Sequence, residues 1–269
     1  MRRVVVTGLG VVTPVGNDVP TMWEALVAGT SGIGRITSFD PGALTSQIAG
    51  EVKGFDPAAY LSPKEIKHSE HFVQFAIAAA KQAVADAGVQ VAREDPFRCG
   101  VLIGCGIGSM KLIEQQAEVL HTRGPQKISP FMIPMLIVNM APGQVAMDLG
   151  FKGPNSCTAT ACASGSHGVG EAFRLIQFGY ADIMLGGGTE SCITPLTIGG
   201  FCALMALSRR NDQPARASRP FDKERDGFVI GEGAGILLLE ELEHAKRRGA
   251  TIYAEMVGYG MTADAYHMT

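Results

Sequence analysis

The sequence has no long apolar run, no strong excess of one charge and few aromatic residues. No segment approaches the roughly 18 consecutive apolar residues that a membrane-spanning helix needs, and the apolar run at the start is too short for a signal sequence. The net charge is −3 and there is no basic tract, which argues against nucleic acid as a partner. We therefore expect a cytoplasmic protein that binds neither a membrane nor nucleic acid.

The cysteines lack the spacing of a disulfide framework or of a metal site. They form no Cys-x-x-Cys pair, and no histidine stands at the spacing of a metal partner. Reduced thiols in a cytosolic protein are the expected state, with no metal. Gly8-Leu9-Gly10 lacks the third glycine of a dinucleotide-binding loop, because position 13 is Thr, so no cofactor is expected. The six cysteines are Cys99, Cys105, Cys157, Cys162, Cys192 and Cys202.

Apolar segments of strand length alternate with segments of helical length. This alternation predicts an α/β fold with a mostly parallel sheet that helices cover on both faces. An apolar helical stretch at 131–149 is interrupted by Pro134 and Pro142, which is typical of a pocket or an interface. Strands are predicted at 3–7, 99–106, 181–188, 236–239 and from 252, and helices at 20–28, 62–86, 109–121, 164–178 and 240–248.

The stretch from 154 to 170 places a thiol among small residues at the start of a helix. Small side chains flank Cys162, and an apolar helix is predicted from Ser164 to Phe178. The unpaired N–H groups and the dipole at a helix start favour negative charge, so such a thiol ionises readily and becomes a nucleophile. The alternative is a buried cysteine that behaves as a small apolar side chain. These residues alone leave both interpretations open.

Several motifs, in matching order, resemble the elongating β-ketoacyl-[acyl-carrier-protein] synthases of bacterial fatty-acid synthesis, those of the synthase II type in particular. The resemblance covers the whole chain and implies the thiolase-like fold, in which two similar βαβαβαββ halves form five α-β-α-β-α layers. Residues 1–250 would be the N-terminal half, and 251–269 the beginning of the C-terminal half. The motifs lie at 4–10 (Val-Val-Val-Thr-Gly-Leu-Gly), 104–108 (Gly-Cys-Gly-Ile-Gly), 160–165 (Thr-Ala-Cys-Ala-Ser-Gly), 219–222 (Arg-Pro-Phe-Asp) and 231–235 (Gly-Glu-Gly-Ala-Gly).

The resemblance implies an acyltransferase of fatty-acid elongation that works as a cytosolic homodimer. Cys162 would carry the acyl group as a thioester, which is then condensed with malonyl-[acyl-carrier protein] with loss of carbon dioxide. Its backbone N–H would serve an oxyanion hole. The alternative role of the pocket positions is core packing. Among these positions, Met132 would cross the dimer interface. The alternative for Lys64 and Lys67 is that they belong to a solvated helix start. The matched positions are Gly106, Ile107, Met132 and Phe201 for the acyl pocket, and Lys64, Lys67 and Lys127 for the acyl-carrier protein.

The family's mechanism also needs two histidines and a lysine from its second half, and no histidine here matches them. We therefore expect the chain to be the N-terminal portion of a longer enzyme, inactive alone. A polyketide-type condensing subunit and a non-catalytic half that binds carrier protein are the alternatives. A degradative thiolase shares the fold, but the residues around Cys162 and the charged loop at 209–226 favour the synthase. The histidines are His68, His71, His121, His167, His244 and His267.

Overall fold

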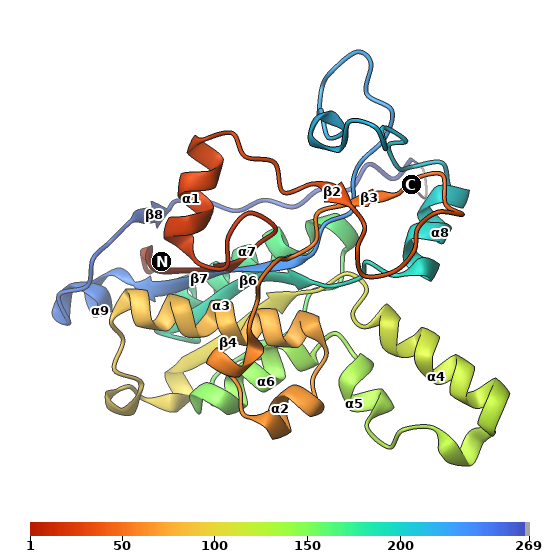
Figure 1. Ribbon diagram of the computed structural model, residues 1–269. Coiled ribbons are helices and arrows are strands. Elements are labelled where there is room, and N and C mark those ends of the chain that lie inside the picture. Colours follow the sequence, from red (N-terminus) through yellow and green to blue (C-terminus); the bar gives the residue numbers. More distant parts are fainter. Residues whose placement is uncertain (267–269) are drawn as a thin grey trace.

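The computed structural model describes residues 1–266 and is built around a six-stranded sheet with the order β5-β4-β6-β7-β1-β8 (Figure 1). A separate two-stranded sheet pairs β2 with β3. The strands are β1 (Val4–Val12), β2 (Gly34–Arg35), β3 (Ile48–Ala49), β4 (Cys99–Gly104), β5 (Asn155–Ser156), β6 (Ile183–Glu190), β7 (Gly233–Glu241) and β8 (Ala254–Met256).

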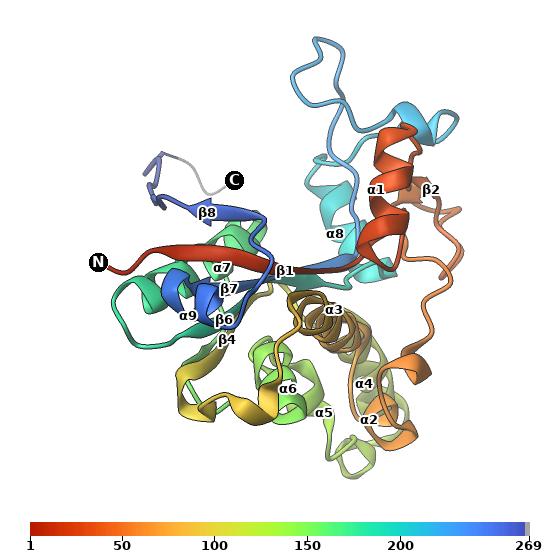
Figure 2. The same ribbon diagram turned by 90° about the vertical axis from the view of Figure 1, so that its left-hand side faces the viewer.

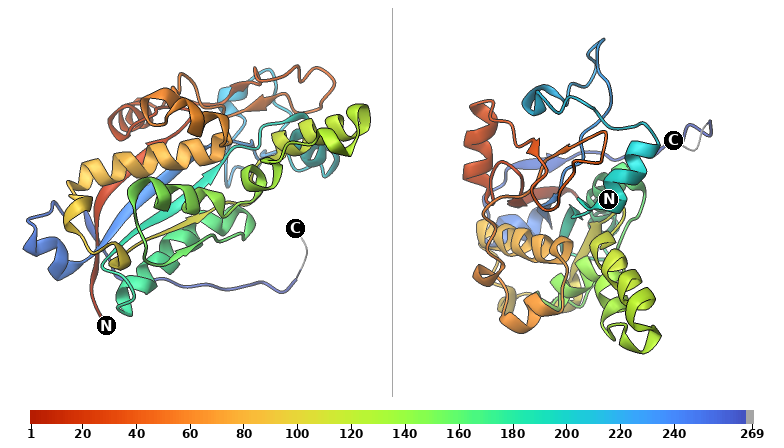
Figure 3. Two further views of the ribbon diagram at one scale, coloured as in Figure 1. Left: turned by 90° about the horizontal axis from the view of Figure 1, so that it is seen from below. Right: turned by 45° about the vertical axis from the view of Figure 1, so that its right-hand side comes forward.

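The helices cover the sheet or extend beyond its ends. Figure 3 shows α4 extending past the sheet and segment 209–226 projecting from it at the top of the right panel. None of the helices within residues 1–266 has the length and apolar character needed to cross a bilayer. The helices are α1 (Val19–Val27), α2 (Pro63–Lys67), α3 (His71–Ala87), α4 (Met110–Arg123), α5 (Met132–Leu136), α6 (Met140–Leu149), α7 (Ser164–Gln177), α8 (Pro195–Ala203) and α9 (Leu242–Arg247).

The main sheet is mixed, so the prediction of a mostly parallel sheet is wrong. β4 runs parallel to β5 and β6, whereas β7 is antiparallel to both β6 and β1, and β8 is antiparallel to β1. The prediction rested on the continuous apolar runs of the strands. Such runs report burial on both faces of a sheet, which is usual in parallel sheets but does not fix the direction of a strand.

Helices cover both faces of the sheet, as predicted. Successive side chains of a strand point to opposite faces. On β4, Val101 and Ile103 join the core under α3, while Leu102 between them joins the core under α7. On β6, Leu185 and Met184 divide in the same way. Figure 2 shows α3 and α6 on one side of the sheet and α7 on the other.

The long helix predicted at 62–86 is two helices, α2 and α3, and side chains explain the break. The hydroxyl of Ser69 donates to the carbonyl of Glu65 (2.7 Å), and the amide of Gln74 donates to the carbonyls of Ile66 (3.2 Å) and Ser69 (2.9 Å). The carbonyls of Glu65, Ile66 and Ser69 therefore have hydrogen-bond donors although the helix does not continue beyond α2. The stretch at 131–149 is interrupted, but the break lies between Leu136 and Met140 and not at Pro134 or Pro142 as predicted. Both prolines lie in the first turn of a helix, where a missing N–H is tolerated.

An ion cluster joins the starts of three strands. Arg98 donates to both carboxylate oxygens of Asp182 (2.9 and 3.0 Å), and Arg2 pairs with the same carboxylate and donates to the carbonyl of Ala181 (3.0 Å). The hydrogen bonds from Arg98 lower the pKa of Asp182, and those from Arg2 add to this effect against the opposing effect of burial, so that the pKa is about 2. The charged carboxylate of Asp182 thus stabilises the sheet at the edge where β1, β4 and β6 begin.

A second cluster surrounds Glu240, a fully buried residue of β7 (0% exposed). Its carboxylate accepts hydrogen bonds from Thr7, from Arg248 (Nε, 2.9 Å) and from the ring of His244 (Nδ1, 2.8 Å). The other ring nitrogen of His244 lies 3.0 Å from Glu94. Burial alone raises the pKa of Glu240, but the hydrogen bonds of these donors outweigh it and lower the pKa to about 2.

We expect the protein to lose stability steeply in acid. Both carboxyls have a lower pKa in the folded chain than in the unfolded chain, so their stabilisation is present above the unfolded pKa of roughly 4 and is lost as the pH falls toward 2. Each carboxyl accounts for about 2–3 kcal/mol of the free energy of unfolding. Urea unfolding followed across this pH range measures the loss. Asp182→Asn should make the pH dependence shallower, and an unchanged slope would contradict the assignment.

Candidate functional site

Cys162 lies on the single turn that leads into α7. This turn is the 3₁₀ helix η5 (Ala161–Ala163), and α7 begins at Ser164, as predicted. The Cys162 side chain is exposed, whereas Cys105 is buried. Among residues 1–266, no acceptor takes a hydrogen bond from the backbone N–H of Cys162. An exposed thiol and an N–H group without an acceptor among residues 1–266 thus stand together at the start of a helix of 14 residues.

A network of hydrogen bonds holds the turn that carries Cys162. The buried hydroxyl of Ser164 accepts from the backbone N–H of Thr160 (2.8 Å) and donates to the carbonyl of Ala161 (2.7 Å). The hydroxyl of Thr158 donates to the carbonyl of Ser164 (2.8 Å). Ala161 has a φ of 49°, in the left-handed region that residues other than glycine seldom adopt. The network maintains this conformation and so fixes the direction in which the thiol points.

Glycines let α7 approach the sheet so closely that backbone touches backbone. A Cβ atom at Gly104 of β4 would lie 2.1 Å from the carbonyl oxygen of Ser164, and one at Gly168 of α7 would lie 2.3 Å from that of Gly187. Neither position has room for a side chain. The distance between the start of α7 and the ends of β4 and β6, and with it the position of Cys162, is therefore set by main-chain contacts.

His167, the histidine nearest to Cys162 in the sequence, is directed at the turn. Its Nδ1 lies 2.7 Å from the hydroxyl of Thr160, and the ring meets Tyr259 edge-on, with the ring centroids 6.3 Å apart. His68 stacks on Phe131 with centroids 4.2 Å apart. For His267 the family resemblance implies a match to a loop histidine that is not one of the catalytic pair, and this residue lies outside the described residues.

Glu190, at the end of β6, holds the loop that follows β4. Its carboxylate accepts hydrogen bonds from the backbone N–H groups of Gly106 (2.8 Å), Ile107 (2.9 Å) and Gly108 (3.0 Å). It also accepts one from the thiol of Cys105 (3.3 Å). Burial, reinforced by this carboxylate, strongly raises the pKa of Cys105. Cys105 is thus a protonated, buried thiol, in contrast to the exposed Cys162.

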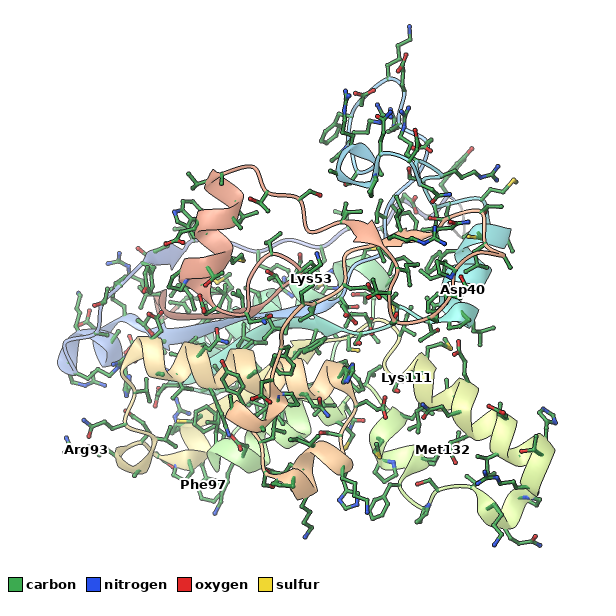
Figure 4. All side chains as sticks on the ribbon, viewed as in Figure 1. Asp40, Lys53, Arg93, Phe97, Lys111 and Met132 are labelled. Atoms are coloured by element: carbon green, nitrogen blue, oxygen red, sulfur yellow. The ribbon has the colours of Figure 1, made fainter. Side chains whose placement is uncertain are left out.

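Three of the four predicted pocket residues lie near one another. Ile107 and Phe201 pack partly buried against the same apolar cluster, which includes Ile198. A Cβ atom on Gly106 would lie 3.5 Å from the carbonyl oxygen of Ala161, which places this loop beside the turn of Cys162. Met132 is not part of that cluster among the described residues. Figure 4 shows it on α5, apart from α8.

The three predicted carrier-protein lysines are exposed. Lys64 and Lys67 lie on α2, which begins with a capping box formed by Ser62 and Glu65. Lys127 ends the 3₁₀ helix η4 (Pro125–Lys127). In Figures 1 and 2 both segments lie on the lower side of the molecule. Within residues 1–266, no group of three or more histidine, cysteine, aspartate or glutamate side chains is placed to hold a metal ion.

Ser164 and Glu190 are the parts of this site that the sequence analysis missed. Ser164 is the first residue of α7, where its hydroxyl can reach main-chain groups of the preceding turn. Glu190 ends a buried strand, and a carboxylate at that place indicates a nearby group of donors. The place of Ser164 at the start of a helix and that of Glu190 at the end of a buried strand were the signals in the sequence that could have identified them.

The sequence is similar to a known protein family and to curated proteins of two bacteria. Residues 1–245 match the family described as beta-ketoacyl synthase, N-terminal domain. The 3-oxoacyl-[acyl-carrier-protein] synthase 2 of Synechocystis sp. is 56% identical over 268 residues, and the alignment covers 100% of this chain and 64% of the relative. The protein of the same name from Coxiella burnetii is also 56% identical, with 100% and 65% covered. The chain thus spans just under two thirds of the length of these relatives.

Solved structures share the fold. A β-ketoacyl synthase from Burkholderia phymatum has a TM-score of 0.92 and 36% identity, and the match covers 100% of this chain and 66% of that one. A type II polyketide ketosynthase, solved with its acyl-carrier protein and bound to a hexaketide, has a TM-score of 0.87 and 39% identity, with 100% and 65% covered. The α/β fold is the thiolase-like fold of these ketosynthases, as predicted. The chain belongs to the β-ketoacyl synthase family, whose N-terminal domain it contains.

Proposed function

We propose that this chain is the nucleophile-bearing part of a 3-oxoacyl-[acyl-carrier-protein] synthase of fatty-acid elongation. The observation that carries the proposal is the exposed thiol of Cys162, held on a braced turn at the start of α7. Relatives that are 56% identical carry the name of this enzyme and support the choice of reaction. In the same proposal residues 1–250 form the N-terminal half of the enzyme, and 251–269 begin its second half.

In the first step, the thiolate of Cys162 attacks the carbonyl carbon of an acyl thioester on the carrier protein. The negative oxygen of the tetrahedral intermediate accepts a hydrogen bond from the backbone N–H of Cys162, which has no other acceptor among residues 1–266. The bond to the carrier sulfur then breaks, and that sulfur takes a proton and leaves as a thiol. The acyl group remains on Cys162 as a thioester.

In the second step, malonyl-[acyl-carrier protein] loses carbon dioxide, and the electron pair released forms an enolate. The enolate carbon attacks the acyl group on Cys162, and the bond to the cysteine sulfur breaks. The product is a 3-oxoacyl chain on the carrier, and Cys162 returns as a thiolate. This use of the thiol requires Cys162 to stay reduced, which fits a reducing compartment such as the cytoplasm.

The acyl chain would lie beside the loop that carries Gly106 and Ile107, with Phe201 on the facing helix. The shared apolar cluster of Ile107 and Phe201 supports this placement. Met132 would enter the pocket of the second subunit in a homodimer. The apolar side chains exposed around α5, Phe131 (44% exposed) and Ile133 (59% exposed), support an interface at this helix.

The acyl-carrier protein would bind near Lys64, Lys67 and Lys127. All three side chains are exposed and available to an acidic partner. The related ketosynthase that was solved in complex with its acyl-carrier protein supports a partner of this class. The same structure favours a second candidate function, a polyketide-type condensing subunit, because its bound chain is a hexaketide.

A condensation assay with the natural full-length protein tests the proposed function. Hexadecenoyl- or dodecanoyl-carrier protein is mixed with malonyl-carrier protein, and the products are identified by mass spectrometry. We expect one malonyl unit to be added, with release of carbon dioxide and a 3-oxoacyl product. A series of products with several unreduced keto groups would favour the polyketide candidate. No keto product from either acyl chain would refute both.

A further inference from the structure

A single carboxylate shapes the loop beside Cys162. Three consecutive backbone N–H groups, from Gly106 to Gly108, converge on Glu190 at 2.8–3.0 Å. Convergent main-chain N–H groups of this kind form a concave site that normally binds an anion. Here the anion is a side chain of the protein itself, delivered from the end of β6.

Glu190 is the only acceptor that these three N–H groups have among residues 1–266. The loop also contains Gly108 with a φ of +80°, a conformation that side chains rarely adopt. Its local shape therefore depends on glycine for its backbone angles and on Glu190 for its hydrogen bonds. Without the carboxylate, the three N–H groups lose their partner, and the loop loses the hydrogen bonds that fix its backbone at 106–108.

The loop connects Glu190 to both sides of the proposed acyl site. On one side, Ile107 packs with Phe201 against an apolar cluster. On the other side, the Cβ position of Gly106 lies 3.5 Å from the carbonyl of Ala161 and 3.2 Å from Glu190 itself. A shift of this loop therefore moves the Ile107 side chain relative to the thiol of Cys162.

We propose that Glu190 is a positioning residue that determines acyl-chain specificity, because its carboxylate fixes the backbone of 106–108 and thereby the place of Ile107 relative to the turn that carries Cys162. The proposal rests on the proposed function and adds to it the residue that sets the pocket shape. Discrimination between acyl chains that differ by a few methylene groups requires a rigid pocket, because each methylene group changes the free energy of binding only modestly. Glu190 supplies this rigidity without touching the substrate.

The variant Glu190→Gln tests the proposal with almost no change in size. Its amide has one oxygen instead of two, and its NH₂ group faces N–H donors, so at least one of the three loop amides loses its acceptor. We expect Cys162 of the natural full-length protein still to be acylated. The ratio of acylation rates between the preferred chain and a chain several carbons longer or shorter should fall by about tenfold. Intact-mass spectrometry of the acyl-enzyme, with hexanoyl-, dodecanoyl- and hexadecanoyl-carrier protein, gives the rates.

Glu232→Gln is the matched control. The Glu232 carboxylate stands next to Gly233, the strand partner of Glu190, and accepts hydrogen bonds from Val52 (3.0 Å) and Ser191 (2.8 Å). It holds no part of the loop at 106–108. We expect its chain-length profile to match that of the unmodified protein. An unchanged profile in Glu190→Gln, or an equal change in both variants, would overturn the proposal.

Amide hydrogen exchange on the unmodified protein tests the proposal without requiring any variant to fold. The N–H groups of 106–108 should exchange markedly more slowly than those of the exposed segment 209–226. Rapid exchange at all three would show that Glu190 does not hold the loop and would refute the proposal. If the loop is protected but no acyl chain is transferred to Cys162, then the proposed function fails while the role of Glu190 in shaping the loop stands.

Discussion

Replacing Cys162 with alanine is expected to lower the rate of acyl-enzyme formation by at least about a thousandfold. In the proposed reaction a thiolate binds the acyl group covalently, and alanine offers no nucleophile. The surrounding turn should survive the change, because the hydrogen bonds that hold it come from Thr158, Thr160 and Ser164. The measurement is the intact mass of the natural full-length protein after incubation with dodecanoyl-carrier protein.

Cys105→Ala is the control for this experiment. Cys105 is 1% exposed, and burial beside Glu190 strongly raises its pKa, so it should carry no acyl group. Brief treatment with iodoacetamide should accordingly alkylate Cys162 before Cys105 in the unmodified protein. Acylation that persists in Cys162→Ala and disappears in Cys105→Ala would transfer the assignment to the other thiol.

Replacing Glu240 with alanine is expected to reduce the free energy of unfolding by about 3–5 kcal/mol. The carboxylate is fully buried, and its removal leaves Arg248 without its main partner and the hydroxyl of Thr7 and the Nδ1 of His244 without theirs. The Arg248 side chain is only 18% exposed, so without its counterion it keeps much of the cost of desolvation and loses the ion pair that offset it. Urea unfolding near neutral pH, followed by circular dichroism, gives the change.

Two further variants test whether the loss of stability comes from the ion cluster around Glu240 or would follow from any substitution near α9. Glu243→Ala removes an exposed carboxylate whose partner is Lys246, and it should change stability little. The double variant Glu240→Met with Arg248→Met removes both charges and should recover much of the loss. If Glu240→Ala were as mild as Glu243→Ala, the buried cluster would not be the stabilising element described here.

The strands of the main sheet other than β5, and the helices other than α8, could be predicted because burial leaves a direct record in the sequence. The run Ile236 to Leu239 is apolar at every position, since α3 covers one face of β7 and α7 the other. The direction of the strand leaves no such record, because side chains of parallel and antiparallel strands are buried alike. The break between α2 and α3 was also missed, since it depends on the particular hydrogen bonds of Ser69 and Gln74.

At the site, the start of the helix that follows Cys162 could be predicted from local residues alone, whereas the role of its thiol could not. The small neighbours and the apolar periodicity after Ser164 are adjacent in the sequence, and the structure bears out the helix boundary. Glu190 could not be linked to Ile107 in this way, because the two are 83 positions apart and meet only through the pairing of β4 with β6. Local patterns place a thiol at the start of a helix, whereas the contacts that shape its surroundings come from tertiary structure.

The close contact of α7 with the sheet limits how this protein can be made more heat-resistant. Exchanging helical glycines for alanine is a standard choice in such engineering, because each exchange ordinarily yields about 1 kcal/mol. Gly165 accepts it, since a Cβ atom there would lie at an ordinary 3.5 Å from the Cα of Gly188. At Gly168 the same exchange would force α7 off the sheet and displace the thiol with it, so a library for thermostability should vary position 165 and leave 168 unchanged.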